Sequence, residues 1–261
     1  MRLTVVGCSG SFPGPESPAS CYLVEADDAD GRTWRVALDL GSGALGPLQR
    51  YVAVAQLDAV LLTHLHADHC LDLCGLYVAL KYDPAGRRPD RVAVYGPAGT
   101  AERMARAYDM PAAPGMTREL EFREWSAGGR VELGPFVVTP ARVEHPVMAF
   151  GLRVEGPAED GSGPRTLVYS GDTDACPSLV DLAAGADLLL AEAAFHEGRD
   201  TPRGVHMTGR RAAQVAVDAG VGSLLLTHLP PWNDPERALA EAREVWTGPL
   251  ALAEPAAVHL L

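Results

Sequence analysis

The sequence is nearly without lysine: Lys81 is the only one, and arginine supplies the rest of the 22 basic residues. Acidic residues number 34, which gives a formal net charge of -12 at pH 7. Nucleic-acid binders neutralise phosphates with basic side chains, so this balance argues against general nucleic-acid binding. A local basic patch could still serve that purpose, and its only dense candidate lies at Arg87, Arg88 and Arg91.

Long apolar runs are also missing, since no stretch of about 18 residues is apolar throughout. We therefore expect no membrane span. Residues 1–7 read as a strand, and they lack the long apolar core and the small-residue cleavage site of a signal peptide. These features predict a cytoplasmic location and no contact with a membrane.

Cysteine is scarce, and the odd number and scattered spacing of the five residues do not indicate a disulfide framework. They stand at Cys8, Cys21, Cys70, Cys74 and Cys176. Cys70 and Cys74 would share a helix face beside the metal-type motif described below. We interpret them as small apolar residues in a core rather than as metal ligands.

At 261 residues, with 47% hydrophobic and 21% charged residues, the chain is long enough to bury a sizeable core. It has no repeat of fixed period and no long linker, so we expect one domain over residues 1–261 that mixes strands and helices. The strands are expected at 3–6, 21–25, 33–40, 59–62, 92–95, 119–125, 130–133, 136–143, 149–155, 166–170, 187–190 and 222–226. The helices are expected at 44–54, 72–81, 100–108, 178–184, 208–219 and 235–247.

Four potential metal ligands stand within six residues, directly after the short apolar run at residues 59–62. That run is rich in branched aliphatic residues, which predicts a buried strand that ends where the ligands begin. The ligands are His64, His66, Asp68 and His69. A strand end gives rigid placement, and imidazoles with a carboxylate suit zinc, iron or manganese. We therefore predict a metal site here, the alternative being a loop of surface polar residues.

Three more candidates, His145, Asp172 and His228, each follow an apolar strand. Taken alone, each has a plainer explanation, as a histidine with a satisfied hydrogen bond or as an aspartate in a turn. Taken together, they would bring ligands from four strand ends to one edge of a layered fold. Asp39 ends another strand. We assign it to orienting an imidazole, with a helix cap as the alternative.

The ligand candidates suffice for two divalent ions, each with about four protein ligands and one position open to water. The assignment is His64, His66 and His145 for one ion, and Asp68, His69 and His228 for the other. Asp172 would bridge the ions, because only a carboxylate has two oxygens to share. Two ions about 3.5–4 Å apart can share a hydroxide and bind a phosphate oxygen.

This series, from Asp39 through the His-x-His-x-Asp-His motif to His228, resembles the five motifs of the metallo-β-lactamase superfamily. The resemblance spans residues 1–261. It implies an αβ/βα sandwich of two packed mixed sheets flanked by helices, with a dinuclear metal site at the sheet edge. Asp68 and the Ser-Gly-Asp-Thr segment around Asp172 are similar to the phosphodiesterase and ribonuclease Z branch rather than to the β-lactam hydrolases.

The segments 191–195 and 205–208 resemble the glutamate and histidine motifs that precede the last ligand in ribonuclease Z relatives. By that resemblance His206, oriented by Glu192, protonates the leaving oxygen. Histidine titrates near neutral pH, which suits a general acid. The alternative is that His206 only begins the helix that follows. His196 and His259 have no such context and are expected to be surface or structural residues.

The chain departs from tRNA-processing ribonuclease Z, which carries a protruding basic arm. Only the 26 positions 146–171 separate His145 from Asp172, and their turn at 159–161 is acidic. The segments 7–11, 17–20, 63–70 and 227–232 resemble those of actinobacterial atypical cyclic-nucleotide phosphodiesterases.

The resemblance thus implies hydrolysis of a small 3′,5′-cyclic nucleotide such as cAMP, by attack of a metal-bound hydroxide on phosphorus. The expected catalytic residues are His206, Glu192, Asp68 and Asp172. Two divalent ions, Zn²⁺ first and Mn²⁺ or Fe²⁺ otherwise, are the expected cofactors, and a homodimer is the implied assembly. The open alternatives are a ribonuclease Z-like RNA 3′-processing endonuclease, a lactone or thioester hydrolase, and a non-catalytic metal-binding or scaffold domain.

Overall fold

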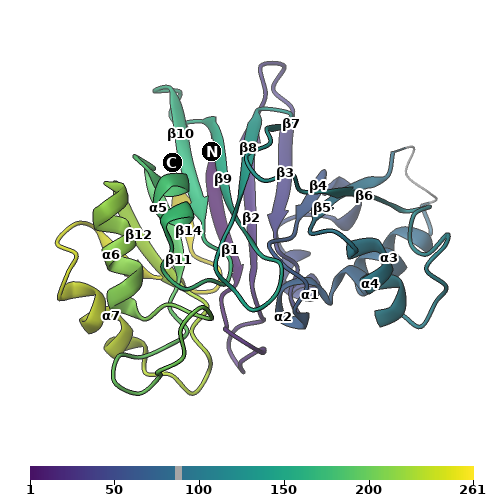
Figure 1. Ribbon diagram of the computed structural model, residues 1–261. Coiled ribbons are helices and arrows are strands. Elements are labelled where there is room, and N and C mark those ends of the chain that lie inside the picture. Colours follow the sequence, from purple (N-terminus) through teal and green to yellow (C-terminus); the bar gives the residue numbers. More distant parts are fainter. Residues whose placement is uncertain (86–89) are drawn as a thin grey trace.

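The computed structural model describes residues 1–85 and 90–261, and within them two seven-stranded mixed sheets lie face to face. Helices cover the outer face of each sheet, so that the layers run helix, sheet, sheet, helix (Figure 1). The expected αβ/βα sandwich is therefore confirmed. Both chain termini lie at one end of the sheets in Figure 1, where the Leu261 N–H donates to the Met1 carbonyl at 2.9 Å.

The first sheet has the strand order β14-β1-β2-β3-β4-β5-β6. Strands β14, β1, β2 and β3 pair antiparallel, whereas β3, β4, β5 and β6 pair parallel. The strands are β1 (Arg2–Gly7), β2 (Cys21–Asp27), β3 (Thr33–Leu38), β4 (Ala59–Leu61), β5 (Val92–Gly96), β6 (Leu120–Glu124) and β14 (Val258–Leu260). Its outer face is covered by α1 (Leu45–Leu48), the 3-10 helix η1 (Val54–Gln56), α3 (Leu73–Lys81) and α4 (Thr100–Ala107). A further short helix, α2 (Ala67–Cys70), follows β4.

The second sheet has the order β13-β12-β11-β10-β9-β8-β7. Its strands are β7 (Val131–Leu133), β8 (Phe136–Arg142), β9 (Phe150–Pro157), β10 (Pro164–Tyr169), β11 (Leu188–Glu192), β12 (Ser223–Thr227) and β13 (Leu250–Leu252). Strands β10 to β13 are parallel, and β7 to β10 are antiparallel neighbours. The helices on this sheet are α5 (Pro177–Ala183), α6 (Gly209–Ala219) and α7 (Pro235–Arg243).

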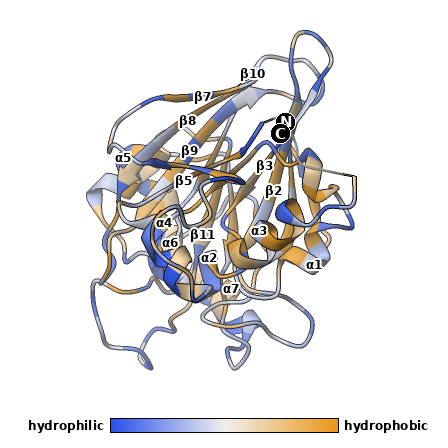
Figure 2. Ribbon diagram, turned by 90° about the vertical axis from the view of Figure 1, so that its right-hand side faces the viewer, coloured by the Kyte–Doolittle hydropathy of each residue, from blue (hydrophilic) through white to orange (hydrophobic). Residues whose placement is uncertain are grey.

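Burial on both faces explains why several strands read as continuous apolar runs. In β11, Leu188 and Leu190 pack into the core between the sheets, while Leu189 and Ala191 pack against the helices. Successive strand residues point to opposite faces, so a strand between two layers needs apolar residues at every position. Figure 2 accordingly shows hydrophobic colour through much of the middle of the molecule and hydrophilic colour in the loops at its ends.

Element boundaries differ from the sequence-based expectation in a few places. The helix expected over 44–54 is the four-residue α1 followed by η1. Gly46 and Pro47 explain the short helix, because both residue types are poor helix formers. Strands β13 and β14 were not expected, since three residues are too few to give a readable alternation. The last helix ends at Arg243 instead of 247.

Two residues of the basic candidate patch, Arg87 and Arg88, are not among the residues that the structure describes. Arg91, which is described, donates to the Thr117 carbonyl at 3.1 Å and lies 3.9 Å from Glu121. Within residues 1–85 and 90–261, none of the helices combines the length and the hydrophobicity needed to cross a membrane.

Replacing Phe136 with alanine should lower the free energy of unfolding by about 3–5 kcal/mol, because it leaves a cavity in the core between the sheets. Phe136 is 1% exposed. Urea unfolding at a fixed metal concentration measures the change. Phe12→Ala is the matched control, since that ring is 38% exposed, and it should cost less than about 1 kcal/mol. Equal losses in the two variants would contradict this placement of the core.

Candidate metal centre

Strand ends from both sheets meet at one end of the molecule, opposite the chain termini. Parallel strands present their carboxyl ends at the same edge of a sheet, which is where open α/β sheets place their ligands. The residues delivered there are Asp39 after β3, His64 after β4, His145 after β8, Asp172 after β10, Glu192 at the end of β11, and His228 after β12. The two sheets are tied together at this point, because the Phe150 N–H donates to the Thr63 carbonyl at 3.0 Å.

Gly171 allows this close approach of the two sheets. Its φ is +58°, in the left-handed region that favours glycine. A Cβ at this position would lie 2.8 Å from the Cβ of Thr63 and 2.9 Å from the carbonyl oxygen of Phe150. A larger residue would therefore push apart the segments that carry His64 and Asp172.

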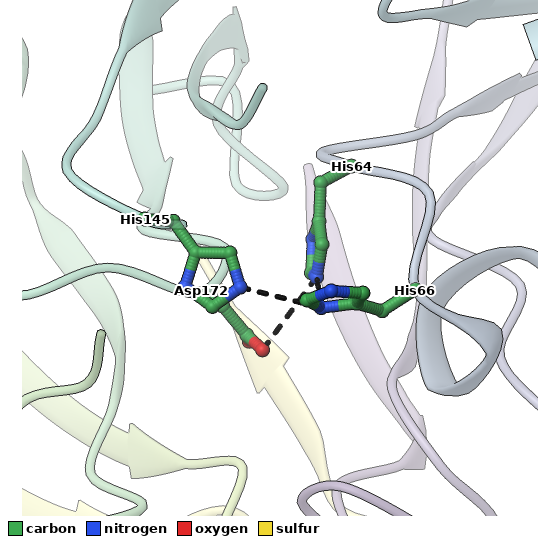
Figure 3. Close-up of side chains that lie close together, drawn as sticks. All are labelled: His64, His66, His145 and Asp172. Atoms are coloured by element: carbon green, nitrogen blue, oxygen red, sulfur yellow. Dashed lines mark hydrogen bonds and ion pairs between the residues drawn. The ribbon is translucent and has the colours of Figure 1, made fainter. Parts of the chain in front are cut away.

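One group of ligand atoms comes from His64, His66, His145 and Asp172, whose side chains point toward one another (Figure 3). The Nδ1 of His66 lies 3.0 Å from the Nε2 of His64 and 3.3 Å from the Nε2 of His145. The Nε2 of His64 lies 3.7 Å from the Oδ2 of Asp172. Nitrogen and oxygen lone pairs from two sheets thus face a common point.

A second group comes from Asp68, His69, His228 and again Asp172. The Nε2 of His69 lies 3.1 Å from the Oδ1 of Asp172, and the Nε2 of His228 lies 3.3 Å from its Oδ2. The Oδ2 of Asp68 lies 3.5 Å from the Nε2 of His69. The two oxygens of Asp172 therefore stand between the two groups.

The chemistry of this cluster fits a divalent metal ion. The Nε2 of His69 and the Oδ1 of Asp172 are buried and lack a hydrogen-bond partner, although they lie 3.1 Å from each other. Buried polar atoms without partners are costly unless something else satisfies them. All ligand atoms within each group lie within 4.8 Å of one another, and among the described residues no such group includes a cysteine.

Protonation in the cluster is compatible with metal binding. Burial, with His69 nearby, holds the pKa of His64 well below its usual range, so its ring is neutral as a ligand must be. Burial also lowers the pKa of His69, but the carboxylates of Asp172 and Asp39 outweigh it and raise the pKa well above the usual value. A divalent cation at this position would therefore take the place of a proton.

The carboxylate of Asp39 organises the buried side of the site. It is fully buried and accepts two hydrogen bonds from Thr63, one from the amide at 2.7 Å and one from the hydroxyl at 2.8 Å. Its Oδ2 also lies 2.7 Å from the Nδ1 of His69 and accepts from the hydroxyl of Tyr169 at 2.9 Å. The contact with Nδ1 directs the Nε2 of His69 toward Asp172, which is the imidazole-orienting position expected for Asp39.

Two other imidazoles are oriented in the same way. The Nδ1 of His145 donates to the Val205 carbonyl at 2.8 Å, which leaves its Nε2 as the acceptor nitrogen of the ring. The Nδ1 of His228 lies 2.9 Å from the hydroxyl of Ser20. In both rings the Nδ1 makes this contact, and the Nε2 faces the cluster.

His206 stands at the open side of the cluster and is paired with Glu192. Its Nδ1 lies 2.8 Å from the Oε1 of Glu192. The Glu192 carboxylate is fully buried; its Oε1 also accepts from the Thr173 amide and its Oε2 accepts from the Ala194 amide, each at 3.0 Å. Burial lowers the pKa of His206, but the charge and hydrogen bond of Glu192 outweigh burial and raise it to about 9. The imidazole is therefore charged and able to donate a proton near neutral pH.

An ion pair that sequence analysis missed holds the loop before α6. Arg211 pairs with Asp174 and donates to the His206 carbonyl at 3.0 Å, while Asp174 accepts from the Gly204 amide at 3.0 Å. This loop supplies both His206 and the Val205 carbonyl. The available signal was that Asp174 stands two residues after Asp172, but nothing in the sequence points to Arg211 as its partner.

The remaining candidates lie outside the cluster. His196 is buried, at 1% exposed, and its Nδ1 lies 3.5 Å from Glu241. His259 lies in β14, in the edge strand of the first sheet. Cys70 and Cys74 pack among the apolar residues between the first sheet and its helices, and all five cysteines are free thiols.

Known proteins share this fold and much of this sequence. The family model described as "Beta-lactamase superfamily domain" matches residues 35–229. "Uncharacterized protein Rv1339" of Mycobacterium tuberculosis is 42% identical over 252 residues, covering 96% of this chain and 88% of that protein. "Ribonuclease Z" of Myxococcus xanthus is 30% identical over 302 residues, covering 97% and 95%.

A third relative connects the sequence with a solved structure. "Probable metallo-hydrolase YhfI" of Bacillus subtilis is 31% identical over 255 residues, covering 97% of each chain. The crystal structure of YhfI, described as a metallo-beta-lactamase fold protein, matches with a TM-score of 0.85 at 30% identity, over 100% of this chain and 99% of that one. The chain therefore belongs to the metallo-β-lactamase superfamily.

Proposed function

We propose that this protein is a metal-dependent phosphodiesterase that uses two divalent ions to hydrolyse 3′,5′-cyclic nucleotides such as cAMP. Membership of the superfamily and the relative named as a probable metallo-hydrolase support hydrolysis. The cyclic phosphodiester is the finer part of the proposal, and it rests on the arrangement of the cluster.

One observation carries the proposal: two ligand groups share Asp172, and the paired His206 stands beside both. The His206 ring centroid lies 5.4 Å from that of His145 and 5.8 Å from that of His228, which belong to different groups. A phosphodiester needs charge neutralised on its oxygens and a proton delivered to the alkoxide that leaves. Two cations held around the shared carboxylate of Asp172 would neutralise the charge, and the adjacent imidazolium of His206 would deliver the proton.

The residues of the chain then take distinct roles. Two bound divalent ions would supply charge neutralisation at phosphorus and an acidified water. His64, His66 and His145 would hold one ion, Asp68, His69 and His228 the other, and Asp172 both. His206 would donate its proton to the 3′ oxygen, and Glu192 would keep the ring charged and oriented until then.

Zinc is the first candidate for both ions. The donors are imidazole nitrogens and carboxylate oxygens, a set that suits zinc and also manganese or iron. Selectivity among such ions depends on ligand type, geometry and metal availability, so Mn²⁺ and Fe²⁺ remain the alternatives to test in the same assays.

RNA cleavage of the ribonuclease Z kind is the second candidate, favoured by the 30% identity to the ribonuclease Z of Myxococcus xanthus. Two observations weigh against it. The segment between His145 and Asp172 consists of the paired strands β9 and β10 and their turn, with no inserted arm. The net charge of -12 also disfavours a long polyanion more than a small cyclic nucleotide.

Zinc-loaded or manganese-loaded protein should convert 3′,5′-cAMP to 5′-AMP, and Asp172→Ala should abolish this turnover and lower the bound metal. Asp172 contributes to both ligand groups, so its loss removes a donor from each. Nucleotide chromatography and elemental analysis measure the two quantities. His259→Ala, which changes a histidine outside the cluster, should leave both unchanged. No turnover by wild-type protein that holds two metals would rule out the substrate and shift the assignment to RNA ends.

His206→Ala should retain near-normal metal content but lower kcat for cAMP by about 10²–10⁴-fold, because it removes the proton donor without removing a proposed ligand. Glu192→Gln should also lower kcat, since the neutral amide no longer holds the imidazole charged. Steady-state kinetics with parallel metal analysis distinguish this result from metal loss. An unchanged kcat in His206→Ala would remove the general-acid role.

A further inference from the structure

Two large aromatic side chains are exposed beside the metal cluster, although they come from loops far apart in the sequence. Phe12 is 38% exposed and Trp232 is 65% exposed. Their ring centroids lie 4.9 Å apart with an interplanar angle of 40°. Adjacent exposed rings of this size commonly mark a binding surface.

Both rings are carried by segments that touch a proposed metal ligand. The amide of Ser11, next to Phe12, donates to the Nε2 of His228 at 3.3 Å. Consecutive Cα atoms are about 3.8 Å apart, so Phe12 follows directly after a residue that contacts a proposed ligand. Trp232 follows His228 by four positions, and in Figure 1 both loops lie at the end of the sheets where the strand ends meet.

The Phe12 loop is held in place by its backbone. The Gly10 amide donates to the Leu229 carbonyl at 3.0 Å, and the Ser9 hydroxyl donates to the Phe12 carbonyl at 2.7 Å. A Cβ on Gly10 would lie 2.1 Å from the His228 carbonyl oxygen, so only glycine permits this contact between the loops. The exposure of Phe12 is therefore imposed by the fold.

The Trp232 loop is fixed just as firmly. The Asn233 amide donates to the Pro230 carbonyl at 2.8 Å, which closes a turn around Trp232. The Asn233 side chain donates to the Ala194 carbonyl at 2.7 Å and accepts from Arg199 at 2.8 Å. A bulky apolar ring is thus held out in solvent on an ordered turn.

Backbone strain occurs where the two loops meet. Ser11 has φ +63° and His228 has φ +58°, both in the left-handed region that is costly for residues with a side chain. Strain of this kind persists only where surrounding contacts impose it, and it concentrates at functional sites. Here the imposed backbone shape presents the aromatic pair next to the cluster.

We propose that Phe12 and Trp232 form an aromatic platform on which the base of the nucleotide substrate stacks. The inference rests on the proposed function and adds to it the part of the site that recognises the base. A base cannot enter between the rings, because a sandwich needs about 7 Å between them, twice an ordinary contact distance. It would lie on the exposed face of Trp232 with Phe12 bracing the ring from the other side. Stacking has no hydrogen-bond code, so adenine and guanine should be accepted alike.

Equilibrium binding of 5′-AMP and of ribose 5-phosphate to the full-length, zinc-loaded protein tests the platform without depending on turnover. The two probes share a phosphate and a ribose and differ in the base. Stacking of one base is worth about 1–3 kcal/mol, so calorimetry should find 5′-AMP bound about 5- to 150-fold more tightly than ribose 5-phosphate. Trp232→Ala should bring the two dissociation constants within about twofold, and Trp232→Phe should retain most of the preference.

Tyr82→Ala is the matched control, because Tyr82 is also 65% exposed but follows the C-terminal end of α3, away from the cluster. It should leave the preference for 5′-AMP unchanged. Equal binding of the two probes by wild-type protein, or equal weakening of both in Trp232→Ala, would overturn the platform. So would a dimer, detected by sedimentation, that Trp232→Ala dissociates without changing the preference, because the rings would then be an interface between copies.

Failure of the proposed function gives a different pattern. If wild-type protein does not hydrolyse cAMP, yet its preference for 5′-AMP is lost in Trp232→Ala, the reaction is wrong and the base-binding surface stands. If cAMP is hydrolysed and the preference is absent, the reaction stands and the platform is overturned. In kinetic terms, Trp232→Ala should raise KM for cAMP by about tenfold with little change in kcat.

Discussion

The buried carboxylate of Asp39 is the contact on which the site depends. It accepts from the amide and hydroxyl of Thr63, contacts the Nδ1 of His69 and accepts from the hydroxyl of Tyr169 in the other sheet. A fully buried carboxylate is costly unless such partners satisfy it. One partner, Thr63, directly precedes His64, and another is the proposed ligand His69. Tyr169 comes from the other sheet, so the orientation of the ligand side chains depends on how the two sheets pack.

The cluster therefore exists only when the two sheets are packed. His64 comes from the first sheet, whereas Asp172 and His228 come from the second. The contact between His64 and Asp172, at 3.7 Å, therefore joins residues from different sheets. The contact between His228 and Asp172, at 3.3 Å, joins two residues that follow strands of the second sheet. Binding of a metal by such a set stabilises the packed state, since the unfolded chain has no preformed site.

Sequence patterns predicted the ligand-bearing strand ends because apolar runs and ligand residues are local features. They also predicted the partnership of His206 with Glu192, through resemblance to known motifs, and the structure brings these side chains to 2.8 Å. The aromatic pair of Phe12 and Trp232 was out of reach, since it joins loops more than two hundred residues apart. The ion pair of Arg211 with Asp174, which are 37 residues apart, was also hidden, because a contact between separate elements leaves no periodicity in the sequence.

The central claim, that these side chains bind two ions around Asp172, is tested most directly by anomalous diffraction at the zinc absorption edge from crystals of the zinc-loaded protein. We expect two peaks about 3.5–4 Å apart, one among His64, His66 and His145 and the other among Asp68, His69 and His228, with the carboxylate of Asp172 between them. A single peak, or a peak elsewhere, such as beside His196 and Glu241, would contradict it.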